Sequence, residues 1–365
     1  MKFSISKEAF LAALQQVQHV VSTRTTLPIL SNVLLKADKN GLHLTTTDLD
    51  VGVSGTAEAE VTEAGSTTLP ARRLATIIRE LPASEVDFSV DEKNIAHIKS
   101  GPSYFKVHGL AADEFPALPT FTDAKEFKIE QSVLKDCLRK TSYSISTDET
   151  RYVLNGILCS FKENNLVMVA TDGRRLAMVE QELEFPQSHE VEIIIPTKAV
   201  NEIQRLLGDS GEVTLKVVAG QIGFDLGNYF LCSKLIEGNY PNYRQVIPGE
   251  AKEKIALERE ALLSTLGRVS LLLSDKSNSI KLHFSKDNLE VLASAADVGE
   301  ARESLPISYK GPEMTIAFNP EFLMAPLRNL VADEVQLHLI DEISPGVLRS
   351  GANFLYVLMP MRVNS

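Results

Sequence analysis

The sequence of 365 residues has few of the features that mark membrane, secreted or metal-binding proteins. No apolar run approaches the roughly 18 residues of a membrane-spanning helix, and the N-terminus MKFSISKEAF alternates like a strand, without the apolar core of a signal peptide. The three cysteines, Cys137, Cys159 and Cys232, have no C-x-x-C spacing, so we interpret them as buried thiols in a reducing compartment. We therefore expect a cytoplasmic protein with no membrane partner.

The common catalytic signatures are also missing. The seven histidines are dispersed, and there is no H-E-x-x-H, no Walker loop, no G-x-G-x-x-G after a strand and no G-x-S-x-G. The segment Thr47-Asp48-Leu49-Asp50 could be imagined as a divalent-metal loop, but its counterpart later in the chain has arginine in place of the second acid. We expect no enzyme activity, no metal and no cofactor.

What the chain does contain is an internal repeat. The stretches FSISKEAFLAALQQV from Phe3, FKIEQSVLKDCLRKT from Phe127 and IALEREALLSTLGRV from Ile255 each join an alternating strand to a helix with apolar residues at i, i+3, i+4 and i+7. A proline just ahead of a second helix also recurs, at Pro70, Pro196 and Pro320. Each copy is predicted as strand, helix, three strands, and the same again. This pattern indicates an α+β protein of three tandem domains, which we place at 1–123, 124–250 and 251–365.

The segment VATDGRRLAMV (169–179) contains an Asp-Gly pair between apolar runs, a pattern typical of a two-residue hairpin turn. The pair Thr171-Asp172 recurs 124 residues earlier as Thr47-Asp48, so we assign Thr-Asp to the architecture of the repeat. Gly173-Arg174-Arg175 belongs to the second copy alone.

Positive charge is concentrated in the predicted helices. The chain has 37 Lys and Arg against 48 Asp and Glu, a net charge of −11, which argues against a protein that simply coats nucleic acid. The six predicted helices nevertheless hold twelve basic and six acidic residues, so they carry +6 and the remainder carries −17. Solvated helix faces would explain any one helix. Six helices in equivalent positions that together carry +6 favour a surface for the phosphates of DNA. The predicted helices are 7–21, 71–81, 131–142, 197–207, 259–273 and 319–330.

Several separate motifs resemble the bacterial β sliding clamp family, the processivity subunit of DNA polymerase III. They are TLPILSNVLL (26–35), RYVLNGIL (151–158), ATDGRRLA (170–177), NYPNYRQVIP (239–248) and YVLMPMR (356–362). The resemblance spans essentially the whole chain. It implies the DNA clamp fold, in which two chains join head to tail as a ring, with helices lining the inner face and antiparallel sheets outside.

The implied function is to encircle double-stranded DNA without reading its sequence and to tether the replicative DNA polymerase catalytic subunit. A clamp loader opens such rings, and other polymerases, ligase and repair proteins bind through short linear peptides. The peptide pocket carried over from the family motifs comprises Leu154, Thr171, Gly173, Arg174, Arg175, Leu176, Pro241, Arg244, Val246, Ile343, Val357, Leu358, Met359, Pro360, Met361 and Arg362. The family often has His where Arg174 stands, which suggests a somewhat different peptide preference.

The resemblance also implies DNA contacts and a subunit interface. The DNA contacts would be Arg24, Arg72, Arg79, Lys198 and Lys234, whereas Asp148 and Glu149 occupy a loop where a polar residue often meets DNA. The homodimer interface would place an apolar centre beside an ion pair of Arg73 with Glu300 or Glu303. Pro102 and Tyr104 stand where arginines form interface ion pairs in other members, which predicts a reduced ionic contribution. The apolar centre would be Ile77, Leu81, Phe105 and Val107 facing Leu271 and Leu272.

One alternative stays open at the level of sequence. A non-topological scaffold, with three domains that recruit peptides without closing a ring, would have the same motifs. Salt dependence of DNA binding separates the two, because an electrostatic binder leaves DNA as salt rises, whereas a closed ring stays on circular DNA.

Overall fold

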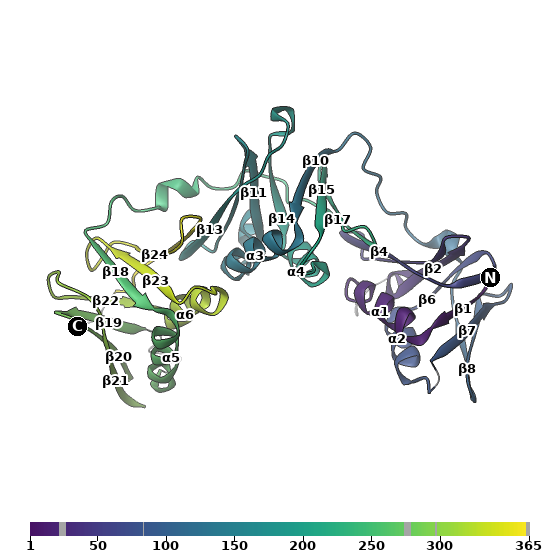
Figure 1. Cartoon of the computed structure of the whole chain (residues 1–365), viewed down its shortest axis with the longest axis horizontal. Helices are drawn as coiled ribbons and strands as arrows, with labels where there is room; N and C mark the ends of the chain where they lie inside the picture. Colours follow the sequence, from purple (N-terminus) through teal and green to yellow (C-terminus); the bar gives the residue numbers. More distant parts are fainter. Residues whose placement is uncertain (22–26, 83, 274–278, 296–297, 363–365) are drawn as a thin grey trace. The chain divides into compact units, whose positions relative to one another are not determined.

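The computed structural model describes residues 1–21, 27–82, 84–273, 279–295 and 298–362 (Figure 1). Two compact units divide the chain. The first combines Met1–Lys135 with Lys198–Leu235, and the second combines Asp136–Thr197 with Ile236–Ser365. The second sequence copy is therefore shared between the two units, which are described separately below.

The first copy follows the predicted order with one addition. A short strand, β5, pairs with β1 and has mostly exposed side chains, so its sequence lacks the alternation that would have predicted it. The elements are β1 (Lys2–Ser6), α1 (Lys7–Val17), β2 (Asn32–Asp38), β3 (Gly41–Thr47), β4 (Val51–Ala57), β5 (Glu60–Glu63), β6 (Gly65–Pro70), α2 (Ala71–Glu80), β7 (Glu85–Val90), β8 (Ile95–Ser100) and β9 (Ser103–His108).

The second copy has the predicted order of strand, helix and three strands, repeated. Its elements are β10 (Lys125–Glu130), α3 (Gln131–Thr141), β11 (Gly156–Lys162), β12 (Asn165–Thr171), β13 (Arg175–Glu182), β14 (Val191–Pro196), α4 (Thr197–Leu206), β15 (Glu212–Val218), β16 (Gln221–Asp225) and β17 (Tyr229–Lys234).

The third copy repeats the same order. Its elements are β18 (Glu253–Glu258), α5 (Arg259–Val269), β19 (Ile280–Ser285), β20 (Asn288–Ala295), β21 (Gly299–Pro306), β22 (Met314–Phe318), α6 (Pro320–Asn329), β23 (Glu334–Leu339), β24 (Gly346–Ser350) and β25 (Phe354–Leu358).

Antiparallel ladders join the copies within each unit. The first unit contains a five-stranded sheet (β5-β1-β7-β8-β9) and an eight-stranded sheet (β10-β15-β16-β17-β4-β3-β2-β6), in which β17 of the second copy pairs with β4 of the first. The second unit contains a four-stranded sheet (β21-β20-β19-β22) and an eight-stranded sheet (β14-β11-β12-β13-β25-β24-β23-β18), in which β13 pairs with β25. A continuous sheet explains why the second copy does not form a compact unit of its own.

Local sequence accounts for most helix boundaries. Ser6 Oγ accepts the Ala9 N–H at 3.1 Å and caps α1, and the proline landmarks lie at or next to the starts of α2, α4 and α6. The prediction that the first helix extends to residue 21 was wrong. It ends at Val17, and the apolar Val20 and Val21 that suggested a longer helix are buried in the turn that follows.

Helices pack in pairs against the sheets. In the first unit α1 contacts α2 as well as β3 and β4, and in the second unit α5 contacts α6 as well as β20 and β21 (Figure 1). The buried face of α1 is Phe10, Ala13, Leu14 and Val17, the spacing of an amphipathic helix. All three cysteines are buried, and burial raises the pKa of Cys232 to about 11, so they serve as core residues.

Candidate functional site

The hairpin loop between β12 and β13 is held by two side chains. Thr171 Oγ1 donates to the Arg175 carbonyl at 2.6 Å and accepts the Gly173 N–H at 3.1 Å. Asp172 Oδ1 accepts the N–H groups of Arg174 and Arg175 at 2.9 and 3.0 Å. These bonds satisfy the backbone of the turn locally.

The loop between β3 and β4 in the first unit is built in the same way. Thr47 Oγ1 donates to the Val51 carbonyl at 3.0 Å and accepts the Leu49 N–H at 3.0 Å. Asp48 Oδ1 accepts the N–H groups of Asp50 and Val51 at 3.1 and 2.8 Å. The same four hydrogen bonds therefore occur 124 residues apart, which confirms that Thr-Asp belongs to the repeat architecture.

The predicted hairpin is confirmed, but its predicted two-residue turn was wrong. Thr171 pairs with Leu176, so four residues lie between the paired positions. A two-residue Asp-Gly turn would need a positive φ at both residues, whereas Gly173 has φ +84° and Asp172 does not. Leu49 has φ +80° at the equivalent place in the first loop, a conformation that favours glycine.

The two arginines after the turn have different surroundings. Arg175 Nε lies 3.0 Å from Asp172 Oδ2, and its guanidinium lies 4.4 Å from the centre of the Phe322 ring. This side chain is fixed by an ion pair and a cation–π contact. Arg174 is exposed, and its carbonyl accepts the Met359 N–H at 3.0 Å, which joins the loop to the C-terminal segment.

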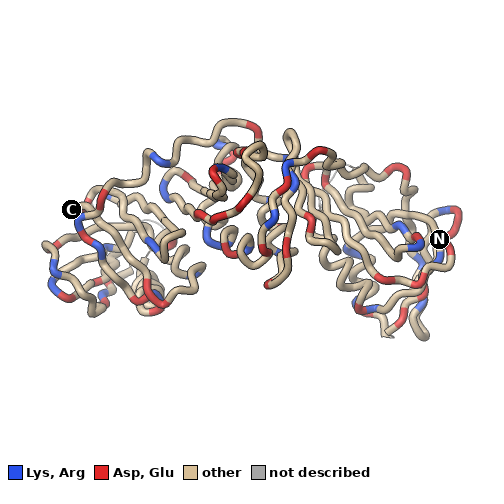
Figure 2. The backbone as a smooth tube through the Cα atoms, turned by 45° about the horizontal axis from the view of Figure 1, so that its top comes forward, with Lys and Arg blue, Asp and Glu red and all other residues tan. Residues whose placement is uncertain are grey.

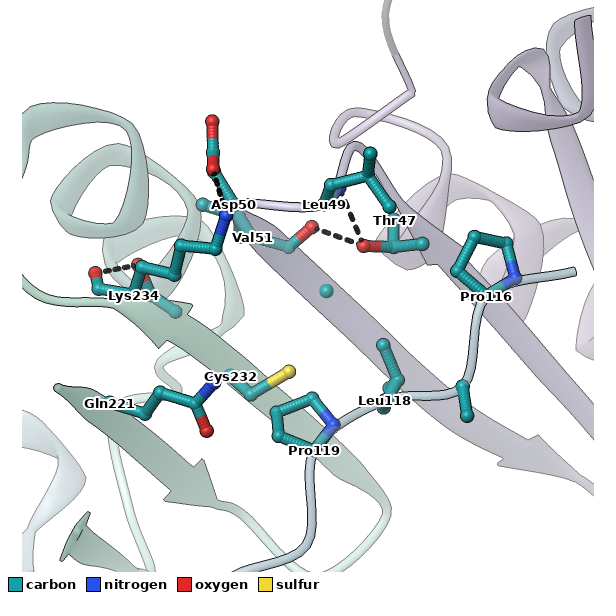
Figure 3. Close-up of a pocket in the computed structure, with 13 residues that line it drawn as sticks. Thr47, Leu49, Asp50, Val51, Pro116, Leu118, Pro119, Gln221, Cys232 and Lys234 are labelled. Atoms are coloured by element: carbon teal, nitrogen blue, oxygen red, sulfur yellow. Dashed lines mark hydrogen bonds and ion pairs between the residues drawn. The ribbon is translucent and has the colours of Figure 1, made fainter. Parts of the chain in front are cut away.

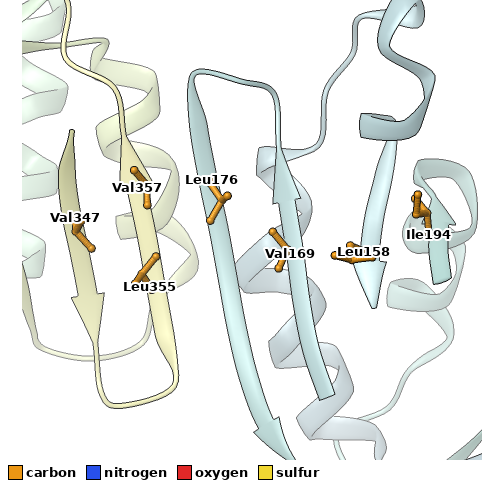
Figure 4. Packing of buried hydrophobic residues seen from close by; sticks show 7 residues of the cluster. All are labelled: Leu158, Val169, Leu176, Ile194, Val347, Leu355 and Val357. Atoms are coloured by element: carbon orange, nitrogen blue, oxygen red, sulfur yellow. The ribbon is translucent and has the colours of Figure 1, made fainter. Parts of the chain in front are cut away.

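Several of the predicted pocket residues are core residues. Leu176 and Val357 belong to a buried cluster that spans β11 to β14 and β24 to β25, together with Leu158, Val169, Ile194, Val347 and Leu355 (Figure 4). Leu154 and Leu358 are also buried. These residues pack where strands of the second and third copies pair. Because they are buried, little of their side-chain surface can contact a ligand.

Several predicted pocket residues are exposed apolar or basic side chains of the second unit. Ile343 is 85% exposed, and Val246, Met359 and Met361 are also exposed large apolar side chains. Gly173, Arg174, Pro241, Arg244 and Arg362 are exposed, whereas Thr171 and Pro360 are half-buried. Methionine, valine and isoleucine beside arginine provide an adaptable surface for an apolar anchor with polar neighbours.

A cavity of about 380 Å³ adjoins this surface. Of the predicted pocket residues, Pro241 and Arg244 line it. Sequence reasoning missed Tyr240 and Tyr243, which lie in the motif NYPNYR and pack against the buried cluster. The two tyrosines on either side of Pro241 were the available signal. The remaining lining residues are Leu158, Ser160, Lys162, Glu163, Asn165, Val167, Glu180, Glu192 and Asn242.

The candidate DNA contacts differ in their exposure and in the contacts that their side chains already make. Arg24 lies outside the described residues. Arg72 and Arg79 on α2 are exposed, and Arg72 Nη2 lies 3.5 Å from the Val21 carbonyl. Lys198 forms an ion pair with Asp48, and Lys234 Nζ lies 2.8 Å from Asp50 Oδ1. Both lysines are thus engaged with the first-unit loop.

Ion pairs reduce the positive charge expected for the helices. Eight of the twelve basic residues counted in the predicted helices contact a carboxylate. Three of these carboxylates, on Asp48, Asp209 and Glu303, lie outside the helices, which lowers the local charge from +6 to +3. Acidic and basic positions are interleaved in both units (Figure 2). The eight paired residues are Lys135, Arg139, Lys140, Lys198, Arg205, Arg259, Arg268 and Arg328.

A buried carboxyl accompanies Lys198 on α4. Glu202 is buried, and Arg205 Nη1 lies 3.1 Å from its Oε2. Burial raises the pKa of Glu202, an effect that the charge of Asp48 reinforces and that of Lys198 opposes. Lys198, Glu202 and Arg205 of the helix therefore form, with Asp48 of the loop, a compact group of two acids and two bases.

Four of the candidate interface residues lie on two edge strands, Phe105 and Val107 on β9 and Glu300 and Glu303 on β21. Strand β9 is the last strand of the five-stranded sheet, and β21 is the last strand of the four-stranded sheet. Phe105 on β9 is exposed, and Leu271 is 78% exposed, whereas Ile77 and Leu272 are half-buried. A free strand edge beside exposed apolar side chains is a typical place for association.

Three interface assignments change. Leu81 is 2% exposed and Val107 is 7% exposed, so both belong to the core of the first unit and not to its surface. Glu303 accepts from Thr265 Oγ1 at 2.9 Å and from Arg268 Nε at 2.9 Å, which leaves Glu300 as the more available partner for Arg73.

The positions at which the sequence departs from the family pattern, Pro102, Tyr104, Asp148 and Glu149, are all exposed. Tyr104 is exposed, and its hydroxyl lies 2.6 Å from His97 Nδ1, while Pro102 is exposed in the turn before β9. Asp148 accepts the Thr150 N–H at 3.0 Å, and Glu149 is exposed.

Within the described ranges, no helix has the length and apolar character needed to cross a lipid bilayer.

Comparisons with known proteins agree along the whole chain. Residues 1–119, 128–242 and 244–362 match the N-terminal, central and C-terminal domains of the DNA polymerase III beta subunit. The beta sliding clamp of Chlamydia muridarum is 35% identical over 364 residues, with 100% of both chains covered.

Solved structures give the same result. A DnaN sliding clamp from Pseudomonas aeruginosa bound to griselimycin has a TM-score of 0.95 at 34% identity, with both chains fully covered. The sliding clamp of Bacillus subtilis has a TM-score of 0.95 at 28% identity, covering 100% of this chain and 99% of the other. With its three tandem domains of clamp fold, this chain belongs to the DNA polymerase III beta subunit family, the beta sliding clamps.

Proposed function

We propose that two copies of this chain close head to tail into a ring around duplex DNA and tether the polymerase to it. The observation that carries this proposal is a pair of edge strands, β9 in the first unit and β21 in the second, each of which pairs with a neighbour on one side only among the described residues. Two different edges form a heterologous contact, and two such contacts close a dimer. Phe105 and Leu271 supply exposed apolar surface near those edges.

Three domains per chain, proposed at 1–123, 124–250 and 251–365, give six domains in the dimer. The helices would face the DNA, with Arg72 and Arg79 as the most available contacts, because both are exposed and neither has an ion pair within the described residues. Such contacts bind phosphate without reading bases. The chain would act in the cytoplasm, would have no catalytic activity of its own, and would depend on a clamp loader for opening.

The surface of Val246, Ile343, Met359, Met361 and Arg174 would bind short peptides from polymerases, the clamp loader, ligase and repair proteins. Its apolar part would bury a leucine or phenylalanine anchor, at roughly 25 cal/mol per Å² of surface removed from water. Arg174 and Arg244 would orient the polar atoms of the peptide.

Retention on DNA tests the ring. Protein loaded on a nicked circular plasmid should remain bound through a wash at high salt, and should be lost once a restriction enzyme linearises the plasmid. Light scattering across a dilution series should give twice the 40.1 kDa chain mass. A stable monomer, or equal loss from circular and linear DNA, would instead support the non-topological scaffold.

A further inference from the structure

Both lysines that the second copy contributes to the candidate DNA surface are held by one loop of the first copy. Lys198, at the start of α4, forms an ion pair with Asp48. Lys234, the last residue of β17, places Nζ 2.8 Å from Asp50 Oδ1 (Figure 3). The two contacts cross 150 and 184 residues of sequence within the first unit.

The carboxylate of Asp48 is fixed in place. Its Oδ1 accepts two backbone N–H groups of the loop, at 3.1 and 2.8 Å, which leaves Oδ2 for Lys198. The Asp48 side chain is only 14% exposed, and Lys198 Nζ also lies 3.3 Å from the Val20 carbonyl. A carboxylate held by its backbone bonds does not need to be ordered when the lysine binds, so this ion pair is stronger than a freely rotating one.

The second pair is looser. The Asp50 side chain is 70% exposed, and water screens its contact with Lys234. The two pairs therefore differ in strength while sharing one chemistry, in which a carboxylate occupies the place where a phosphate would bind the ammonium group.

Of the two acids, Asp48 has a counterpart in the second copy, Asp172, whereas Asp50 has none there. The loop of the second copy has the same hydrogen bonds, but Arg174 and Arg175 occupy the positions of Asp50 and Val51. The backbone of the turn thus does not require an acid at position 50. The carboxylate there has a different use from that of holding the turn.

We propose that Asp48 and Asp50 act as internal substitutes for DNA phosphates. Their ion pairs with Lys198 and Lys234, which we call the latch, limit the affinity of the chain for duplex DNA. The proposal rests on the proposed function, in which DNA passes along these helices. A lysine that neutralises a phosphate releases a counterion and adds about 0.9 to the salt slope of binding. A lysine already paired with a carboxylate adds less, because the carboxylate competes with the phosphate for the same ammonium group.

Salt-dependent binding of a fluorescein-labelled linear 30-base-pair duplex tests the proposal. Asp48→Asn and Asp50→Asn should each raise affinity at 50 mM NaCl, by up to about tenfold, and steepen the slope of log K against log salt by up to about 0.9. The asparagine Oδ1 of Asp48→Asn can still accept the two loop N–H groups, so the turn is retained. Thermal melting checks that the variants fold.

A matched control separates the latch from a general change in charge. Asp225→Asn removes the same charge from an ion pair with Lys216, 2.9 Å away on neighbouring strands of the first unit. It should leave the salt slope unchanged. An equal rise in affinity for Asp225→Asn, or an unchanged slope for Asp48→Asn, would overturn the proposal.

Second-site variants identify the released groups. Lys198→Ala in the Asp48→Asn background, and Lys234→Ala in the Asp50→Asn background, should return the slope to that of the unaltered chain, and Asp48→Glu should restore much of the latch. If the steeper slope persists without the lysine, the latch assignment is wrong. Failure of the ring proposal is seen separately, as loss of the unaltered protein from circular DNA, which the linear-duplex assay does not measure.

Discussion

The loops Thr47–Val51 and Thr171–Arg175 have the same backbone hydrogen bonds and opposite charge. In both, threonine and aspartate bind the same four backbone groups, and the third residue has a positive φ. After the aspartate, the first loop continues Leu-Asp-Val and the second Gly-Arg-Arg. Thr-Asp therefore determines the turn in both loops. The position after the positive-φ residue is free to vary, so Asp50 pairs with Lys234 in the first unit and Arg174 is exposed in the second.

The residue after each loop differs in size for a packing reason. Gly52 pairs with Cys232, and Leu176 pairs with Val357 at the equivalent place. A side chain at residue 52 would overlap Leu118 and lie 3.0 Å from Cys232 Sγ. In the first unit the side chain of Leu118, from the linker, fills the space beside Gly52 of β4. In the second unit the equivalent residue, Leu176 of β13, is itself a leucine.

The largest effect is expected from removing that leucine. Leu176→Ala should lower the free energy of unfolding by about 2–5 kcal/mol, because it leaves a cavity in the buried cluster of the second unit. Gly52→Ala should cost less, about 1–3 kcal/mol, because the flexible end of Leu118 can shift. Urea unfolding followed by circular dichroism measures both. A larger loss for Gly52→Ala would show that the first junction is the more tightly packed.

Threonine deletions test whether the two turns are equivalent. Thr47→Val and Thr171→Val each remove a hydroxyl that donates one hydrogen bond and accepts another, and each should cost about 1–2 kcal/mol. Hydrogen exchange of the Leu49 and Gly173 amides should accelerate in the matching variant. A cost in one loop and none in the other would contradict their shared construction.

Exchanging the residue types at the third loop position should destabilise the second loop and leave the first almost unchanged. Gly173→Leu should cost about 1–2 kcal/mol, because a leucine pays for the positive φ, and its Cβ would lie 2.8 Å from Arg151 Nη1. Leu49→Gly should be close to neutral, because relief of the same strain offsets the greater freedom of glycine in the unfolded chain. Thermal melting measures both. Equal losses in the two variants would mean that Leu49 makes contacts that outweigh its strain.

A smaller effect on stability is expected when pH changes the protonation of Glu202, which lies beside the first loop. Burial raises the pKa of Glu202, so the folded chain holds this proton more tightly than the unfolded chain does. The contribution of this group to stability is present below the ordinary glutamate pKa and is lost as pH rises through the raised value. Glu202→Gln should therefore gain stability relative to the unaltered chain between pH 4 and pH 7, measured by melting temperature. If the stability advantage of Glu202→Gln over the unaltered chain shrinks as pH rises, the raised pKa of Glu202 is contradicted.

Sequence predicted the elements that depend on local pattern. Proline landmarks and apolar spacing placed all six helices, and alternation placed the main strands. The misses came from tertiary contacts. Strand β5 forms because β1 offers an edge, Leu81 and Val107 are buried by elements that periodicity does not identify, and Lys198 meets Asp48 across 150 residues. Which charges remain free on the helices is therefore a property of the fold.

Peptide binding is the measurement that best separates the two loops, because only the loop of the second unit is proposed to bind peptide. The probe is a fluorescein-labelled short peptide segment of the replicative polymerase catalytic subunit of the same organism that carries a leucine or phenylalanine anchor, and its binding is followed by anisotropy. Arg174→Asp and Met361→Ala in the second unit should weaken binding by about tenfold or more, while Asp50→Arg and Leu49→Ala in the first loop should leave it unchanged. Equal weakening from both loops, or none from Arg174 and Met361, would contradict the assignment of peptide binding to the second unit alone.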